Sequence, residues 1–160
     1  GLTITEDEDR FLERLAPLLS SSPRVLKRFV NTHRLISVGF AERPAPAPRT
    51  PSDTEVRMLL LAIFVAMPEL SRVIQDGLQK VTTGETAPLS PLVAKALAPS
   101  AAPSPFLSEP FSKGRARRQW AAVEAWLLEQ EPAWRDLPSG RLVEWLVQVG
   151  RYTFLLTRGG

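Results

Sequence analysis

The segment 22–36 holds the residues of this chain whose types and spacing suit them best for chemistry. At helical spacing, one face collects cationic and amide side chains, which we call the basic stripe: Arg24, Lys27, Arg28, Asn31 and Arg34. Guanidinium groups bind phosphate and carboxylate oxygens through paired hydrogen bonds. The stripe therefore predicts contact with a nucleotide, a nucleic acid or an acidic protein surface. A plain solvated face opposite the core is the alternative interpretation.

Arg24 is the most informative member of the basic stripe. Ser22 can cap a helix that begins at Pro23, so Arg24 falls in the first turn. A cation there opposes the helix dipole. A bound anion would reverse that balance, because backbone N–H groups and the guanidinium would converge on it. We therefore take Arg24 as a candidate phosphate-sensing residue. Ion pairing of Arg24 or Arg28 with the acidic residues 6–9 is the internal alternative.

The segment 22–36, SPRVLKRFVNTHRLI, resembles a helix of known NTPases. It is similar to the Pro-Arg-x-x-Lys-Arg-Phe-x-Asn-x-x-Arg-Leu helix that follows the nucleotide-binding core of bacterial-type KAP-family P-loop NTPases. More loosely, it resembles the sensor-2 helix of AAA+-like lid domains. The resemblance implies that Arg24 approaches nucleotide phosphate, and it gives Lys27, Arg28 and Asn31 no defined role. Residues 149–156, VGRYTFLL, look like the end of the same helical region.

The nucleotide-binding core itself is missing from this sequence. No Gly-x-x-x-x-Gly-Lys-Ser/Thr motif occurs, so the chain has no phosphate-cradling loop of that kind. The apolar run 58–67 ends in Pro68-Glu69 and suits a buried helix better than a Walker B strand. The resemblance implies a non-catalytic lid or regulatory module, C-terminal to the core of a P-loop NTPase. ATP or GTP with Mg²⁺ would then bind to the parent protein, and this chain would hold no cofactor.

A second basic cluster marks the start of a later expected helix: Lys113, Arg115, Arg117 and Arg118. It is either a solvated, weakly helical end or a second contact with phosphate or nucleic acid. Two alternative functions follow. One is a nucleic-acid-binding helical domain that uses Arg24, Lys27, Arg28 and Arg34 with this cluster; the net charge of +3 is too modest to favour it. The other is a helical protein-interaction domain with an unknown partner.

Catalytic and metal-binding constellations have no support in the sequence. His33 is the only histidine and falls on the apolar side of its helix, so we expect a buried side chain that hydrogen-bonds a carbonyl rather than a metal ligand. No Gly-x-Ser-x-Gly elbow is present. The tryptophans are expected to anchor the core rather than to stack on bases: Trp120, Trp126, Trp134 and Trp145. We expect no enzymatic activity from this chain alone.

Composition predicts one soluble globular domain over residues 1–160. The content of 44% hydrophobic and 23% charged residues is ordinary for that class, and 160 residues can bury one sizeable core. The absence of cysteine fits a cytoplasmic protein and excludes disulfides. No apolar run reaches the roughly 20 residues that a membrane-spanning helix needs.

Apolar periodicity predicts an all-α fold of about six or seven helices. A Thr5–Glu8 capping box opens the first helix, which runs to about Leu19. After 22–36, further helices are expected at 52–67, 69–81, 90–97, 113–130 and 139–156. The last of these is expected to be the most buried, with Leu146 in the core. Two proline-rich segments, about 43–52 and 98–111, predict loops.

Overall fold

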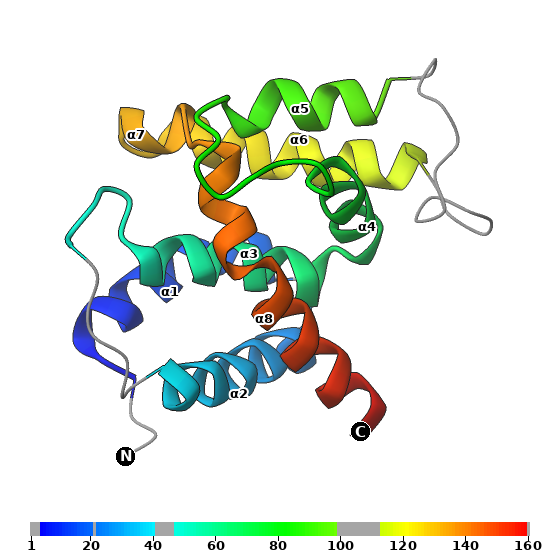
Figure 1. Ribbon diagram of the computed structural model, residues 1–160. Coiled ribbons are helices and arrows are strands. Elements are labelled where there is room, and N and C mark those ends of the chain that lie inside the picture. The colour runs from blue at the N-terminus through cyan, green and yellow to red at the C-terminus, as the bar shows by residue number, and fades with distance from the viewer. Residues whose placement is uncertain (1–3, 21, 41–46, 99–112, 160) are drawn as a thin grey trace. The chain divides into compact units, whose positions relative to one another are not determined.

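The computed structural model describes residues 4–20, 22–40, 47–98 and 113–159, and helices joined by turns and loops make up these ranges (Figure 1). Eight helices occur there: α1 Glu6–Leu19, α2 Pro23–Phe40, α3 Asp53–Ala66, α4 Pro68–Gly77, α5 Leu89–Ala96, α6 Lys113–Glu129, α7 Pro132–Arg135 and α8 Ser139–Gly159. Outside the helices, one isolated β-bridge joins Pro88 and Pro138. The all-α prediction is confirmed. The count exceeds six or seven because the single-turn helix α7 was not predicted.

Side-chain caps fix the start of the first three helices. Thr5 accepts a hydrogen bond from the backbone of Glu8 at 3.1 Å, and the Glu8 carboxylate accepts one from Thr5 N–H at 3.2 Å. Ser52 and Glu55 repeat this reciprocal pattern at α3, with distances of 3.1 and 3.0 Å. At α2, Ser22 Oγ accepts from Val25 N–H at 3.3 Å. These caps satisfy N–H groups that the helices leave unpaired, and the sequence predicted those at Thr5 and Ser22.

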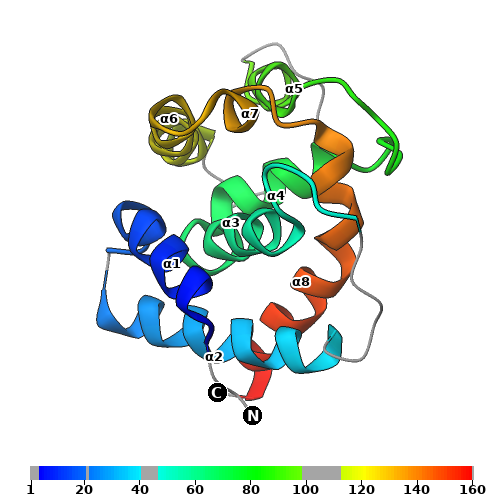
Figure 2. The same ribbon diagram turned by 90° about the vertical axis from the view of Figure 1, so that its left-hand side faces the viewer.

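The chain divides into two compact units, each with its own packing. Unit 1 comprises residues 1–66 and 145–160, and unit 2 comprises residues 67–144. In unit 1, α1 and α2 both pack against α3, which Figure 2 shows nearly end-on. In unit 2, α4 packs against α5 and α6, and α7 packs against α6. The continuous helix α8 begins in unit 2 and continues into unit 1.

Helix α3 is the most buried helix of the described chain. Every residue from 56 to 63 is buried. Its apolar side chains surround the helix axis instead of forming a stripe, and such a helix must be covered on all sides. The expectation that the last helix would be the most buried is wrong. Leu146 is only half-buried and Val147 is 64% exposed, because polar residues at 144, 148 and 151 give α8 a solvent-facing side.

Backbone contacts tie the loop before α5 to the turn before α8 in unit 2. Leu89 N–H donates to the Leu137 carbonyl at 2.9 Å, and Ser139 N–H donates to the Ala87 carbonyl at 2.8 Å. Gly140 approaches the same loop so closely that a Cβ atom there would lie 2.5 Å from the Thr83 carbonyl oxygen. A side chain at position 140 would therefore force the backbone apart.

The expected tryptophan anchors are confirmed in unit 2. Trp120, Trp126 and Trp134 are buried, and the last two meet edge-to-face with ring centroids 5.2 Å apart. Trp145, in unit 1, is half-buried. Helix α4 ends at Gly77 rather than near residue 81. Of the predicted loop 43–52, residues 47–52 are described and are not helical, and residues 43–46 lie outside the described residues. The predicted loop 98–111 lies outside them except for residue 98. Among the described helices, none is long and apolar enough to cross a membrane.

Candidate functional site

The basic stripe lies on the solvent-exposed side of α2, away from α3. Arg24, Lys27, Asn31 and Arg34 are exposed, while Phe29, Thr32, His33 and Ile36 are buried on the opposite side. Two apolar residues, Leu35 and Val38, continue the exposed side towards the C-terminal end of the helix and are 43% and 52% exposed. We call the set Arg24, Lys27, Asn31, Arg34, Leu35 and Val38 the outer face of α2.

The cations of this outer face make no ion pair with the part of the chain that the structure describes. This holds for Arg24, Lys27 and Arg34. Arg28 differs, because it is half-buried and its Nη2 atom donates to the Thr153 carbonyl at 3.5 Å, within unit 1. The basic stripe therefore consists of three exposed cations, the exposed Asn31 and one arginine that contacts α8.

The internal alternative for Arg24 is not supported by the geometry of α1. Glu6 and Asp7 pair with Arg10 of the same helix, at 3.0 and 3.4 Å. Glu8 contacts His33 instead. The acidic first turn of α1 therefore meets α2 at His33, about 14 Å along the helix from Arg24.

His33 takes part in a buried polar cluster of unit 1 that sequence reasoning missed. Its Nε2 atom lies 3.3 Å from Glu8 Oε2, and its ring stacks on Phe29 with centroids 6.1 Å apart. The carbonyl partner expected for His33 is absent among the described residues, so that expectation is wrong. Burial lowers the pKa of His33, an effect that the Glu8 carboxylate opposes and the charge on Arg57 reinforces.

Arg57 brings a third helix into this cluster. It is a buried arginine in the otherwise apolar α3, and its guanidinium lies 5.3 Å from the ring centroid of Trp145. Burial lowers the pKa of Arg57, while the negative charges on Glu8 and Asp53 act in the opposite direction. The short connection between α1 and α2 was a signal that could have placed Glu8 near His33, since the two residues lie at similar distances from position 21. No local signal in the sequence predicted the contribution of Arg57.

Two arginines of the second basic cluster contact other parts of unit 2. Arg115 pairs with Glu69 at 3.0 Å, and Arg117 donates two hydrogen bonds to the Leu97 carbonyl, at 3.1 and 3.0 Å. Burial alone would raise the pKa of Glu69, but hydrogen bonds from Gln119 and Arg115 outweigh it and leave that pKa lowered. Arg115 and Arg117 stay exposed to solvent, and their contacts also hold α6 against α4 and the end of α5. Lys113 and Arg118 have no ion pair within the described ranges.

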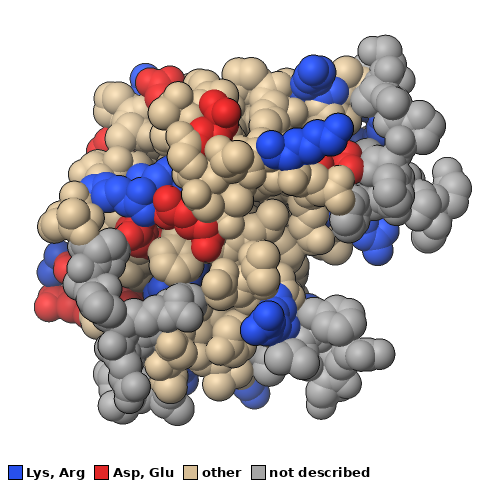
Figure 3. Space-filling view, viewed as in Figure 1, with Lys and Arg blue, Asp and Glu red and all other residues tan. Residues whose placement is uncertain are grey.

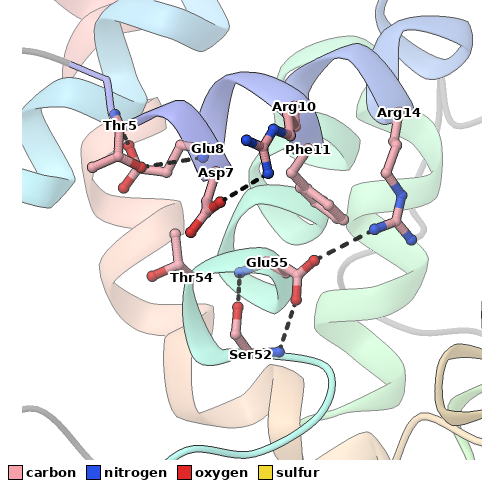
Figure 4. Close-up of a pocket in the computed structure, with 9 residues that line it drawn as sticks. All are labelled: Thr5, Asp7, Glu8, Arg10, Phe11, Arg14, Ser52, Thr54 and Glu55. Carbon is pink, nitrogen blue, oxygen red and sulfur yellow. Dashed lines mark hydrogen bonds and ion pairs between the residues drawn. The ribbon is translucent and has the colours of Figure 1, made fainter.

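An open depression of about 480 Å³ lies between the first turns of α1 and α3 in unit 1 (Figure 4). Acidic and basic side chains line it together with one aromatic ring: Thr5, Asp7, Glu8, Arg10, Phe11, Arg14, Ser52, Thr54 and Glu55. Its charges already satisfy one another. Arg14 lies over the Phe11 ring, 5.1 Å from its centroid, and 3.6 Å from Glu55. Nothing in its lining calls for a ligand.

Charge does not collect into one large field on the face shown in Figure 3, where basic and acidic atoms are interspersed among the coloured residues. No group of three or more potential metal ligands gathers in the ranges that the structure describes. No protein-family model matches the chain, and neither a curated protein nor a solved structure matches it significantly. The outer face of α2 is therefore the candidate site, on the strength of its own geometry.

Proposed function

We propose that this chain is a non-catalytic helical lid or regulatory module of a P-loop NTPase, with Arg24 directed at the nucleotide phosphates. One observation carries the proposal. Arg24 is exposed in the first turn of a helix that Ser22 caps, and it has no ion-pair partner among the described residues. A cation left in that position opposes the helix dipole, and an incoming phosphate would turn both the dipole and the guanidinium into attractions.

The chemistry of such a module is electrostatic. ATP or GTP with Mg²⁺ would bind to a separate nucleotide-binding core, and this chain would add a planar guanidinium to the phosphate oxygens. An arginine in that role stabilises the charge that develops during phosphoryl transfer. A cytoplasmic location, which the cysteine-free sequence fits, would give the protein access to ATP and GTP.

A helical protein-interaction domain is the second candidate, and the exposed Leu35 and Val38 favour it. A nucleic-acid-binding domain has less support. Two arginines of the second basic cluster, Arg115 and Arg117, are engaged inside unit 2. Only Lys113 and Arg118 would remain to extend a phosphate-binding surface.

The proposal is tested in the protein that joins this chain to its nucleotide-binding core. Arg24→Ala should lower the rate of nucleotide hydrolysis, whereas the chain alone should hydrolyse neither ATP nor GTP. Titration of the chain with duplex DNA at rising salt separates the nucleic-acid candidate. Tight binding that weakens steeply with salt, and that Arg24→Ala reduces in step with other cations, would favour nucleic acid over nucleotide.

A further inference from the structure

The C-terminal half of the α2 outer face differs chemically from the half that carries Arg24. Arg34 is followed by Leu35 and, one turn later, by Val38, and all three side chains are exposed. At about 1.5 Å of rise per residue, Val38 lies roughly 21 Å along the helix from Arg24. One small phosphate group cannot contact both ends. The two halves therefore need separate explanations.

We propose that Lys27, Arg34, Leu35 and Val38 form a docking surface for an acidic amphipathic helix of a partner protein. This inference rests on the proposed function and extends it: the partner helix would bind to the module while Arg24 contacts the nucleotide phosphates. Carboxylates of the partner helix would meet Lys27 and Arg34, and its aliphatic side chains would cover Leu35 and Val38.

Charge complementarity is the first argument for this occupant. Lys27 and Arg34 are exposed cations that pair with no carboxylate in the described chain. Glu6 and Asp7 pair with Arg10 and Glu8 contacts His33, while Asp9 and Glu13 of α1 are exposed and pair with neither cation. An acidic partner would therefore find unpaired positive charge on α2 without breaking an internal ion pair.

Leu35 and Val38 favour a protein helix over a nucleic acid or a membrane as the partner. Leu35 and Val38 lie at positions i and i+3, so they form one small aliphatic patch beside Arg34. A sugar–phosphate backbone offers no aliphatic surface to cover such a patch. A membrane-surface helix needs an apolar face along its whole length, yet the N-terminal half of this face is Arg24, Lys27 and Asn31. A helix with mixed acidic and aliphatic residues fits both ends of the patch.

The test uses the whole chain and a defined probe in the absence of nucleotide. The probe is a fluorescent, helix-constrained peptide of about 12 residues, about 18 Å long, with leucines on one face and glutamates beside them. Fluorescence anisotropy measures its affinity, and the affinity should fall as salt rises. Leu35→Ser with Val38→Ser should weaken binding about tenfold or more. Lys27→Glu with Arg34→Glu should do the same and remove the salt dependence.

Matched controls keep the result interpretable. Leu128→Ser alters an exposed leucine on α6, which is 57% exposed against 43% for Leu35, and should leave the affinity unchanged. Arg24→Ala should change it by less than about twofold, because Arg24 lies beyond the patch. All substituted side chains are exposed, so circular dichroism should stay the same for every variant.

Several results would overturn the docking proposal. Equal affinity for a scrambled peptide of the same composition would show that the surface does not recognise leucines and glutamates on separate faces of a helix. Unchanged affinity after the Leu35 and Val38 substitutions would remove the apolar contact. Tighter binding of phosphatidylserine vesicles or duplex DNA, lost in the same variants, would assign the surface to a membrane or a nucleic acid. Absence of peptide binding would contradict the docking proposal but not the role of Arg24, which the rate of nucleotide hydrolysis tests independently.

Discussion

Glu8 of α1 faces His33 of α2 across 3.3 Å in the interior of unit 1. The same carboxylate closes the capping box with Thr5, so one side chain both starts α1 and joins it to α2. His33 is 1% exposed, and Arg57 of α3 adds a positive charge to its surroundings. The contact makes the packing of three helices sensitive to the protonation of one imidazole.

Stability should therefore decrease as the pH falls below about 6.5. Burial lowers the folded-state pKa of His33 from its ordinary 6.5, despite the opposing effect of Glu8. The folded state then prefers the neutral imidazole. Its contribution is complete above pH 6.5 and is lost progressively as the pH falls from 6.5 to the folded pKa. Urea unfolding at pH 7.5 and at pH values down to 5 measures this loss.

His33→Gln isolates the histidine from the carboxylates that titrate in the same range. The variant should have a smaller loss of stability between pH 7.5 and 5 than the wild type, whatever its absolute stability. Arg34→Gln, at the neighbouring exposed position, should keep the wild-type pH dependence. If His33→Gln and the wild type lose stability in parallel, His33 is already protonated or accessible in the folded protein.

Gly140 should tolerate no side chain. A Cβ atom there would lie 2.5 Å from the Thr83 carbonyl oxygen and 2.7 Å from that of Glu85, both of them backbone atoms. Gly140→Ala should destabilise the protein by about 1–3 kcal/mol, as overpacking does. Gly150→Ala is the matched control in the same helix, with Phe64 Cε1 at an ordinary 3.7 Å. Removing a helical glycine there should stabilise by roughly 0.5–1 kcal/mol. In thermal unfolding, the midpoint temperature should fall for Gly140→Ala and rise for Gly150→Ala.

Leu60→Ala should be among the costly core truncations. Leu60 is fully buried in α3, and its loss should cost about 2–5 kcal/mol of unfolding free energy. Leu146→Ala should cost roughly 1 kcal/mol, because Leu146 is half-buried and loses only part of a leucine's transfer free energy. Chemical denaturation of both variants measures the order. A greater loss for Leu146→Ala would mean that α8 contributes more to the core than its exposure indicates.

Local signals in the sequence predicted most helix starts correctly, because caps depend on residues three positions apart. Thr5 with Glu8 is an example that the structure confirms. Burial was harder to predict, since it depends on which faces other helices cover. Leu146 looked central from its spacing alone, yet α3 holds the core. The partners of Arg115 and Arg117, Glu69 and the Leu97 carbonyl, lie 46 and 20 residues away in sequence, beyond any local pattern.

The basic stripe of α2 was predicted from helical periodicity, and Arg24, Lys27, Asn31 and Arg34 are exposed as expected. Arg28 was assigned to the same stripe, but it reaches the Thr153 carbonyl. A contact 125 residues apart depends on where α8 crosses α2, which periodicity within one helix does not contain. The buried cluster of Glu8, His33 and Arg57 has the same origin, because three separate helices build it.

The rate of nucleotide hydrolysis after substitution of Arg24 tests the central claim most directly. The measurement uses the protein that joins this chain to its nucleotide-binding core, and Arg118→Ala serves as control because Arg118 is also exposed and makes no ion pair in the described chain. The account predicts that Arg24→Ala lowers kcat about tenfold or more while the fold is kept. Arg24→Lys should restore little of the rate, because an ammonium group lacks the planar guanidinium fork. Arg118→Ala should leave kcat unchanged. Unchanged kcat for Arg24→Ala would contradict the phosphate role of Arg24 and leave α2 as a protein-docking helix alone.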